Sequence, residues 1–148
     1  MSLAERLRTF VVLDGFSLQQ LSALAMIGDE RAAPAGHVIF REGEDAQELI
    51  FLLEGKVTLR SQGGGHLADA KAPSLLGEMG VLRRKPRLAT ATTTEPSVWL
   101  AVGAEEFHRL KGEDPELGRR FFENLSLVLM GQLERNNLLL EFLENIRK

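Results

Sequence analysis

The sequence predicts a mainly β domain whose short antiparallel strands form a sandwich, roll or barrel, with helices at both ends of the chain. Between about residues 36 and 103, short apolar runs rich in β-forming residues alternate with glycine, proline and acidic turn residues. The flanking segments instead carry helix-capping signals. The 148 residues, 44% hydrophobic and 26% charged, have the size and composition of one globular domain.

A capping box predicts the main helix of the N-terminal segment, residues 1–35. Ser17 can accept a hydrogen bond from the N–H three residues later, while the Gln20 side chain reaches back to the backbone of Ser17. Glycine is common just after the last turn of a helix. We therefore expect a helix from near Ser17 to about Gly28.

Five apolar runs in the central segment, residues 36–103, are expected to be strands, because turn residues bound each of them. These runs are residues 37–40, 48–53, 56–60, 89–94 and 97–102. The three glycines at 63–65 lie between strand-like sequences and lack the Lys-Ser/Thr pair that ends a phosphate-binding loop. We interpret them as the tip of a β-hairpin.

The C-terminal segment, residues 104–148, is expected to form a short helix and then a long one. The short helix is predicted over 104–111, and Asp114 followed by Pro115 is typical of the N-cap and first residue of the next. A helix from there to about Arg147 would be about 50 Å long at about 1.5 Å per residue, longer than one small domain can cover. We therefore expect its distal half to pack against a partner.

A heptad pattern in this long helix predicts a homodimer. Its a and d positions are apolar except for two, and a polar pair in such a seam fixes the register of the helices at some loss of stability. The alternative is a helix packed only on its own domain, because Leu138, Leu140 and Phe142 make the apolar surface broader than a narrow seam. The a and d positions are Phe122, Leu125, Leu129, Gln132, Asn136, Leu139, Leu143 and Ile146.

The segment 76–90 is the part of the sequence most informative about function. Glu78 stands between Gly77 and Gly80, and Arg87 follows the glutamate by nine positions. A short helix starting near Glu78 would present free N–H groups, and the glycines would let a ligand approach the backbone. Arg87 can pair with the same anion, while Glu78 can accept a hydrogen bond from a hydroxyl. These residues predict a sugar phosphate ligand.

This segment resembles the phosphate-binding cassette of the cyclic-nucleotide-binding domain family. The resemblance is carried by residues 77–82 and 86–90, and it extends to the strand and glycine-turn sequences at 36–44 and 49–57. The family includes the catabolite activator protein, kinase A regulatory subunits and cyclic-nucleotide-gated channels. The resemblance implies a jelly-roll-like β-roll (a double-stranded β-helix) of about eight antiparallel strands, with an N-terminal helix and C-terminal hinge and dimer helices.

The resemblance also implies which residues contact the ligand. Glu78 would accept a hydrogen bond from the ribose 2′-hydroxyl, and Arg87 would pair with the cyclic phosphate. The family usually has Ala, Ser or Thr after this arginine, whereas Leu88 keeps only the N–H and is large enough to crowd the pocket. The remaining residues of the implied site, which contribute their backbone, are Gly77, Met79, Gly80, Leu88 and Ala89.

We therefore expect a non-enzymatic sensor that binds cyclic AMP, the first choice, or cyclic GMP, with no other cofactor. Binding would reposition the C-terminal helix and act on an effector protein. Two alternatives stay open: a degenerate domain for dimerisation or docking, with a Glu78–Arg87 salt bridge in place of a ligand, and the effector half of a transcription regulator of the catabolite-activator type. In the latter, the DNA-binding part would lie beyond Lys148 or on another chain.

The rest of the sequence argues against other classes of function. The chain has no cysteine, which excludes thiol catalysis and disulfides, and His37, His66 and His108 lack metal-binding spacing. The net charge of −3 gives no overall attraction for nucleic acid, so we interpret the basic run 83–85 as a solvated turn. No apolar run reaches membrane-spanning length. We expect a cytoplasmic protein with no membrane partner and no direct nucleic-acid contact.

Overall fold

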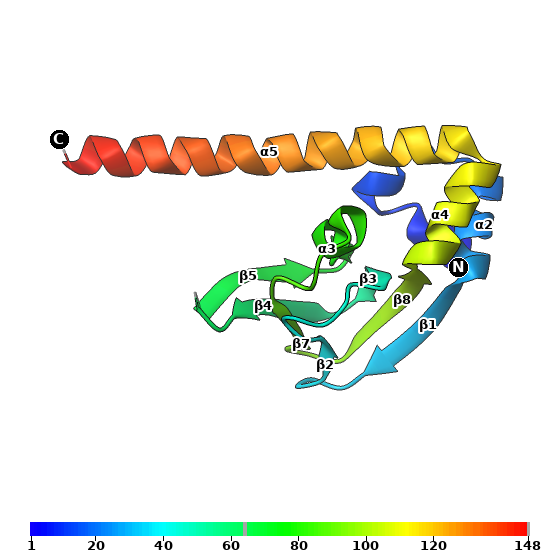
Figure 1. Cartoon of the computed structure of the whole chain (residues 1–148), viewed down its shortest axis with the longest axis horizontal. Coiled ribbons are helices and arrows are strands. Elements are labelled where there is room, and N and C mark those ends of the chain that lie inside the picture. Colours follow the sequence, from blue (N-terminus) through cyan, green and yellow to red (C-terminus); the bar gives the residue numbers. More distant parts are fainter. Residues whose placement is uncertain (64, 148) are drawn as a thin grey trace.

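The chain folds as an antiparallel β-roll with helices at both ends, the architecture predicted from the sequence (Figure 1). The structure, a computed structural model, describes residues 1–63 and 65–147, and for Met79, Leu139 and Arg147 it describes the backbone alone. The helical elements are α1 (Leu3–Leu7), a 3-10 turn η1 (Val11–Leu13), α2 (Leu18–Ile27), α3 (Glu78–Arg83), α4 (Ala104–Glu113) and α5 (Pro115–Arg147).

Eight strands in the described residues form two four-stranded sheets. Neighbouring strands are antiparallel, in the orders β1-β8-β3-β6 and β2-β7-β4-β5. The strands are β1 (Gly28–Ala33), β2 (Val38–Phe40), β3 (Glu48–Glu54), β4 (Lys56–Ser61), β5 (Gly65–Lys71), β6 (Ser74–Leu76), β7 (Thr90–Thr93) and β8 (Ser97–Gly103).

Strand β3 separates two apolar clusters, which explains why its sequence is a continuous apolar run. Successive side chains of a strand point to opposite faces. Leu49 and Phe51 belong to the cluster beneath the helices, whereas Ile50 and Leu52 belong to the cluster inside the roll. Because both faces are buried, each position requires an apolar residue. Trp99 of β8 also lies inside the roll, with 3% of its surface exposed.

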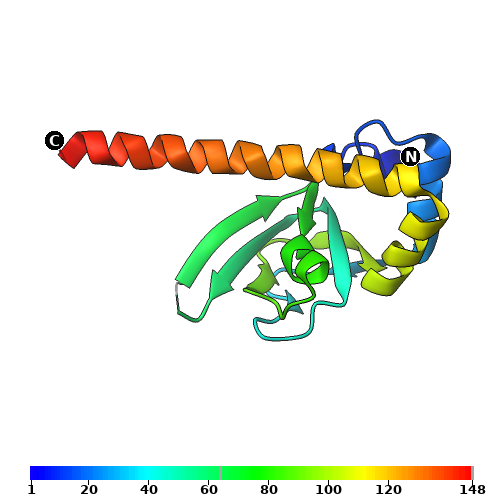
Figure 2. The ribbon, with the colours of Figure 1, turned by 45° about the horizontal axis from the view of Figure 1, so that its top comes forward.

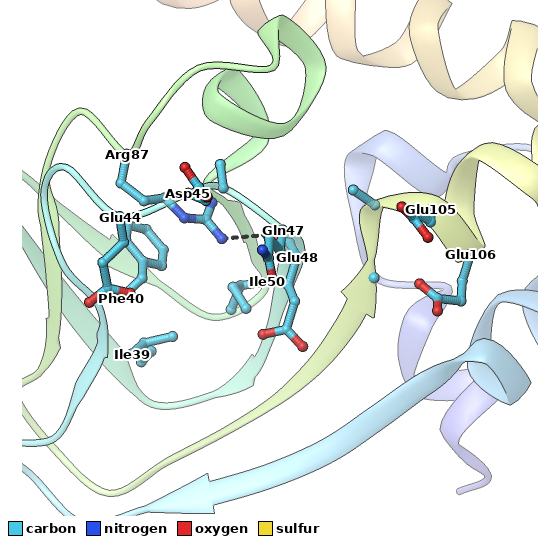
Figure 3. Close-up of a pocket in the computed structure, with 13 residues that line it drawn as sticks. Ile39, Phe40, Glu44, Asp45, Gln47, Glu48, Ile50, Arg87, Glu105 and Glu106 are labelled. Carbon is cyan, nitrogen blue, oxygen red and sulfur yellow. Dashed lines mark hydrogen bonds between the residues drawn. The ribbon is translucent and has the colours of Figure 1, made fainter.

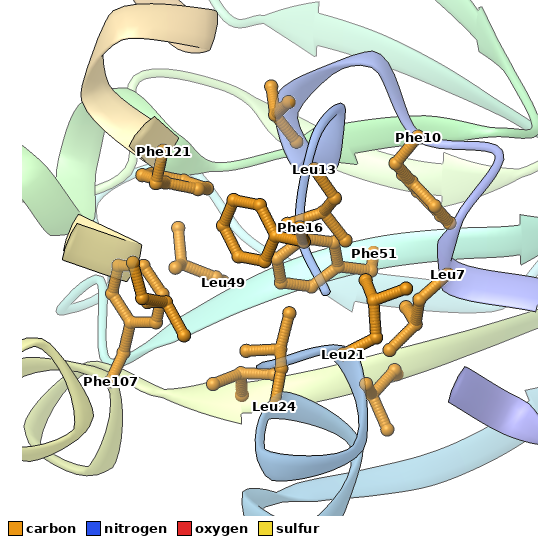
Figure 4. Close-up of a cluster of buried hydrophobic side chains, with 14 of the residues drawn as sticks. Leu7, Phe10, Leu13, Phe16, Leu21, Leu24, Leu49, Phe51, Phe107 and Phe121 are labelled. Atoms are coloured by element: carbon orange, nitrogen blue, oxygen red, sulfur yellow. The ribbon is translucent and has the colours of Figure 1, made fainter. Parts of the chain in front are cut away.

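The larger cluster attaches the helices to the outer face of the β1-β8-β3-β6 sheet (Figure 4). Phe107 of α4 and Phe121 of α5 meet edge to face, with ring centroids 4.9 Å apart. Phe10 meets Phe51 of β3 in the same way, at 5.5 Å. The N-terminal and C-terminal segments of the chain therefore share one core with the sheet.

The predicted helix starts are confirmed by the capping contacts. Ser17 accepts a hydrogen bond from the Gln20 N–H, and the Gln20 side chain accepts one from the Ser17 N–H, which completes the capping box of α2. At the start of α5, the Asp114 carboxylate accepts a hydrogen bond from the Leu117 N–H, 3.2 Å away. Both helices begin where these side chains satisfy backbone N–H groups that lack partners within the helix.

The N-terminal segment 1–35, assigned to helices from the sequence, also contains a strand, because Gly28–Ala33 form β1 and pair with β8 along their whole length. The strand is at the edge of its sheet and is mostly exposed, so its sequence has no apolar alternation. Arg31 of β1 donates two hydrogen bonds of 3.0 Å to the carboxylate of Glu48. Strands β5 and β6 were also absent from the five predicted runs, and β5 is likewise an exposed edge strand.

The predicted hairpin between β4 and β5 is confirmed. The two strands pair antiparallel from Lys56 opposite Lys71 to Ser61 opposite Gly65. Gly64, in the middle of the predicted tip, lies outside the described residues.

The long C-terminal helix is confirmed as α5, of 33 residues, and it extends well past the sheets (Figures 1 and 2). Its first part packs on the roll through Leu117, Phe121 and Leu125, each at most 5% exposed. The assignment of Leu125 to a dimer seam is therefore wrong, because the domain's own core buries this side chain. No helix in the described residues is long and apolar enough to cross a membrane.

Candidate ligand-binding site

Arg87 lies just before β7, in a segment that pairs with the loop between β2 and β3. Its N–H donates to the Glu44 carbonyl at 2.8 Å, and its own carbonyl accepts from the Gly43 N–H at 2.9 Å. Gly43 has a φ of +87°, a conformation that favours glycine. These bonds turn the Arg87 side chain inward, where only 6% of the residue is exposed.

The Arg87 guanidinium is held by main-chain carbonyls and an aromatic ring. Nη1 donates to the Gly77 carbonyl at 3.0 Å. Nη2 donates to the Glu48 carbonyl at 2.7 Å, the bond drawn as a dashed line in Figure 3. The guanidinium carbon lies 4.2 Å from the centre of the Phe40 ring. The buried Nε–H has no partner among the described residues.

This buried cation has no direct counter-ion in the described part of the chain, where Arg87 forms no ion pair. Burial lowers the pKa of the guanidinium, while the charges of Glu48, Glu44 and Glu78 at longer range raise it. A buried charge is costly unless it is paired. An anion that reached the free Nε–H would supply both a partner and the missing charge.

Glu78 is the first residue of α3 and is half-buried near the same guanidinium. Burial raises the pKa of its carboxyl, while a hydrogen bond from its own backbone and the charge of Arg87 lower it. The salt bridge with Arg87 that was the alternative to a ligand site is not formed among the described contacts. The Glu78 carboxylate is thus left to accept a hydrogen bond from a bound hydroxyl.

The two glycines of the cassette allow close packing around α3. Gly77 has a φ of +76°, and a Cβ at this position would overlap the guanidinium of Arg87. At Gly80, a Cβ would lie 2.7 Å from the Cβ of Ala46 in the β2–β3 loop. A side chain at Gly77 would therefore displace the Arg87 guanidinium, and one at Gly80 would separate α3 from the β2–β3 loop.

Leu88 does not fill the space beside Arg87, because 59% of it is exposed to solvent. Ala89, by contrast, is buried. The crowding expected from the large residue after the cassette arginine is therefore not observed. The side chain of Met79 lies outside the described part of the structure.

A pocket of about 640 Å³ lies beside Arg87, between β2, the β2–β3 loop and the start of α4 (Figure 3). Ile39, Phe40 and Ile50 give it apolar surface, and Arg87 is the single cation among its described lining residues. Of the other predicted site residues, Gly77, Glu78, Gly80, Leu88 and Ala89 are not among its described lining residues. The pocket is also lined by five carboxylates, so the guanidinium is the part of its described lining that attracts an anion. These carboxylates belong to Glu44, Asp45, Glu48, Glu105 and Glu106.

The sequence analysis missed two partners of Arg87. Phe40 ends an apolar strand sequence, so the pattern indicates burial but not stacking on a cation. Glu48 contributes its main-chain carbonyl, and this contact would be the same with another residue there. The described residues contain no cluster of three or more side chains suited to a metal ion.

Comparison with known proteins relates the chain to one family. Residues 30–114, more than half of the chain, match the family model of the cyclic nucleotide-binding domain. A cyclic nucleotide-gated potassium channel from Rhizobium etli is 33% identical over 104 residues, which are 67% of this chain and 29% of the channel. A CRP-like cAMP-activated global transcriptional regulator from Mycobacterium tuberculosis is 29% identical over 108 residues, 70% of this chain and 46% of the regulator.

Among solved structures, the Thermus thermophilus catabolite activator protein superposes with a TM-score of 0.74 at 27% identity. The superposition covers 91% of this chain and 63% of that protein. The chain thus spans less than half the length of the two curated relatives above and less than two thirds of this structure. With a roll of the same fold, a buried arginine in the cassette and a family match over most of the roll, the chain belongs to the cyclic-nucleotide-binding domain family.

Proposed function

We propose that this chain is a regulatory domain that binds a cyclic nucleotide, with cyclic AMP as the preferred ligand, and catalyses no reaction. The observation that carries the proposal is the buried Arg87 guanidinium, which has no counter-ion in the described residues and a free Nε–H. A cyclic phosphate has one negative charge and several acceptor oxygens. It would neutralise the guanidinium at short range, where charge-assisted hydrogen bonds are strongest.

The other cassette residues have compatible roles in this proposal. The Glu78 carboxylate, half-buried at the start of α3, would accept the hydrogen bond of the ribose 2′-hydroxyl. The backbone of Gly77, Met79 and Gly80, with the N–H groups of Leu88 and Ala89, would surround the phosphate. The preference for cyclic AMP is supported by the mycobacterial relative, which is a cAMP-activated regulator.

Titration calorimetry with cyclic AMP, cyclic GMP and 2′-deoxy cyclic AMP tests the proposal. The ribose form is expected to bind more tightly than the 2′-deoxy form by about 1–3 kcal/mol, because the deoxy ligand leaves the Glu78 carboxylate without its partner. Glu78→Gln should abolish most of this preference. Glu44→Gln, which changes a nearby exposed carboxylate, should retain it.

Equal affinities of the ribose and deoxy ligands for the unmodified protein would contradict the role of Glu78. Absence of binding by either cyclic nucleotide would contradict the proposed function itself and favour a docking or dimerisation domain.

We also propose that two copies of the chain associate through the distal half of α5, and that this helix transmits ligand binding to an effector. Beyond the part packed on the roll, large apolar side chains of α5 are exposed, including Leu143 at 46% and Ile146 at 64%. Packing these side chains against a second helix is favourable, because it removes apolar surface from water. The roll itself leaves these residues uncovered.

Leu143→Glu combined with Ile146→Glu is expected to convert a dimer into a monomer in sedimentation equilibrium at micromolar concentration. Like charges would face each other in an otherwise apolar seam. Asn137→Glu, which introduces the same charge at an exposed position outside the a and d set, should leave the dimer intact. A monomeric unmodified protein under the same conditions would refute the seam.

A further inference from the structure

A second pocket, of about 890 Å³, lies between α3, α4 and α5 and contains neither Glu78 nor Arg87. In Figures 1 and 2, α3 lies beneath α5 on the side toward α4. We call this pocket the α3–α5 groove. The lining residues that matter for its chemistry are Val81, Leu82, Arg84, Phe107, Lys111 and Phe122.

The base of the α3–α5 groove is apolar. Val81 and Leu82 of α3 are half-buried and pack against the core beneath the helices. Phe107 of α4 is buried, whereas Phe122 of α5 is 39% exposed. Aromatic and aliphatic surface that remains open to solvent in a concave site is typical of sites that bind small molecules.

Three basic side chains line the groove, those of Arg84, Arg109 and Lys111, and Lys111 stands over its aromatic rings. The Lys111 ammonium lies 4.7 Å from the centre of the Phe122 ring and 5.4 Å from that of Phe107. Burial and the positive charge of Arg84 both lower the pKa of Lys111. None of these three side chains forms an ion pair within the described part of the chain, and Glu105 is the single carboxylate among the described lining residues.

Arg84 has an unusual backbone position. It ends α3 with a φ of +54°, and it is the single non-glycine residue with positive φ in the described chain. This conformation favours glycine, because a Cβ is crowded there. Glycine at this position would thus remove the guanidinium without straining the helix end, which makes Arg84→Gly a suitable variant.

We propose that the α3–α5 groove binds an organic anion with an apolar body, such as a carboxylate on a hydrocarbon chain. The acidic group would pair with Arg84 and Lys111, and the chain would cover the apolar base formed by Val81, Leu82 and Phe122. Binding would relieve the repulsion between the two cations and remove apolar surface from water. Since the groove does not contain Arg87, this proposal does not depend on cyclic nucleotide binding.

Titration of the full chain with octanoate, followed by calorimetry and by the NMR signals of the phenylalanine rings, tests the proposal. Octanoate is expected to bind saturably with one site per chain and to shift the Phe122 signals. Octan-1-ol, which has the same chain length and no charge, should bind at least about fivefold more weakly. Arg84→Gly and Lys111→Gln should each weaken octanoate binding by about fivefold while leaving octan-1-ol binding unchanged.

Phe122→Ala should weaken both ligands, because it removes apolar surface rather than charge. Arg83→Gln, which changes a neighbouring exposed arginine that does not line the groove, should have no effect. Equal affinity for octanoate and octan-1-ol, or no saturable binding of octanoate, would overturn the proposal. Octanoate binding that disappears as the protein associates would also overturn it, since a second copy of the chain would then be the occupant of the groove.

Discussion

Arg87→Ala is expected to weaken cyclic nucleotide binding by about 2–5 kcal/mol, or about 30-fold to 5,000-fold, the range for removing one partner of a buried charged pair. The reason is the position of the guanidinium, which is 6% exposed and lacks an ion-pair partner in the described residues. The phosphate of the ligand would therefore lose its main source of neutralisation. Titration calorimetry of the variant and the unmodified protein measures the difference.

The variant is expected to fold, because two opposing effects on stability partly cancel. The substitution removes the hydrogen bonds to the carbonyls of Gly77 and Glu48, but it also removes a buried charge without a counter-ion. Arg83→Ala, an exposed arginine in the same segment, is the matched control and should bind normally. Unchanged affinity in Arg87→Ala, together with an unchanged melting temperature, would remove Arg87 from the phosphate site.

Phe121→Ala is expected to lower the free energy of unfolding by about 3–5 kcal/mol, as large truncations in a core do. The ring is fully buried and meets Phe107 edge to face at 4.9 Å, so the truncation leaves a cavity between α4 and α5. Phe142→Ala makes the same chemical change in the same helix at a position that is 60% exposed. It should change the stability of the monomer by less than about 0.5 kcal/mol.

Guanidinium denaturation, followed by the fluorescence of the single tryptophan, compares these two variants below the concentration at which the protein associates. Trp99 is a suitable reporter, because it lies inside the roll and is 3% exposed. Similar destabilisation by both substitutions would mean that the distal half of α5 also packs on the domain.

The sequence was most informative where one local cause determines the structure. The capping box at Ser17 and the Asp114-Pro115 pair each fix a helix start through contacts within a few residues. The continuous apolar run of β3 follows from burial on both faces. Strand β1 had no such signal, because an exposed edge strand is held by main-chain hydrogen bonds that its side chains do not reveal.

In the candidate site, too, residues identified by local sequence could be predicted, whereas contacts that depend on tertiary structure could not. Glu78 and Arg87 could be identified as candidates from the sequence, because a carboxylate and a guanidinium are the groups that would recognise a hydroxyl and a phosphate. The placement of Arg87 over Phe40 and against the Glu48 carbonyl depends on how the β2–β3 loop folds over it. The outward direction of the Leu88 side chain depends in the same way on tertiary structure.

The contacts of residues 47 and 48 link Arg87 to the C-terminal helices. The Glu48 carbonyl accepts from Arg87 at 2.7 Å, and the preceding carbonyl, of Gln47, accepts from the N–H of Ala104 at the start of α4, also at 2.7 Å. Two adjacent planar peptide groups thus join the guanidinium to the first turn of α4. A movement of α4 that displaced the Gln47 carbonyl would therefore also displace a hydrogen-bond acceptor of Arg87. If anion binding at Arg87 shifted α4 in this way, an effector that stabilises one position of α4 would, by thermodynamic reciprocity, change the affinity for the anion by the same factor that the anion changes the affinity for the effector.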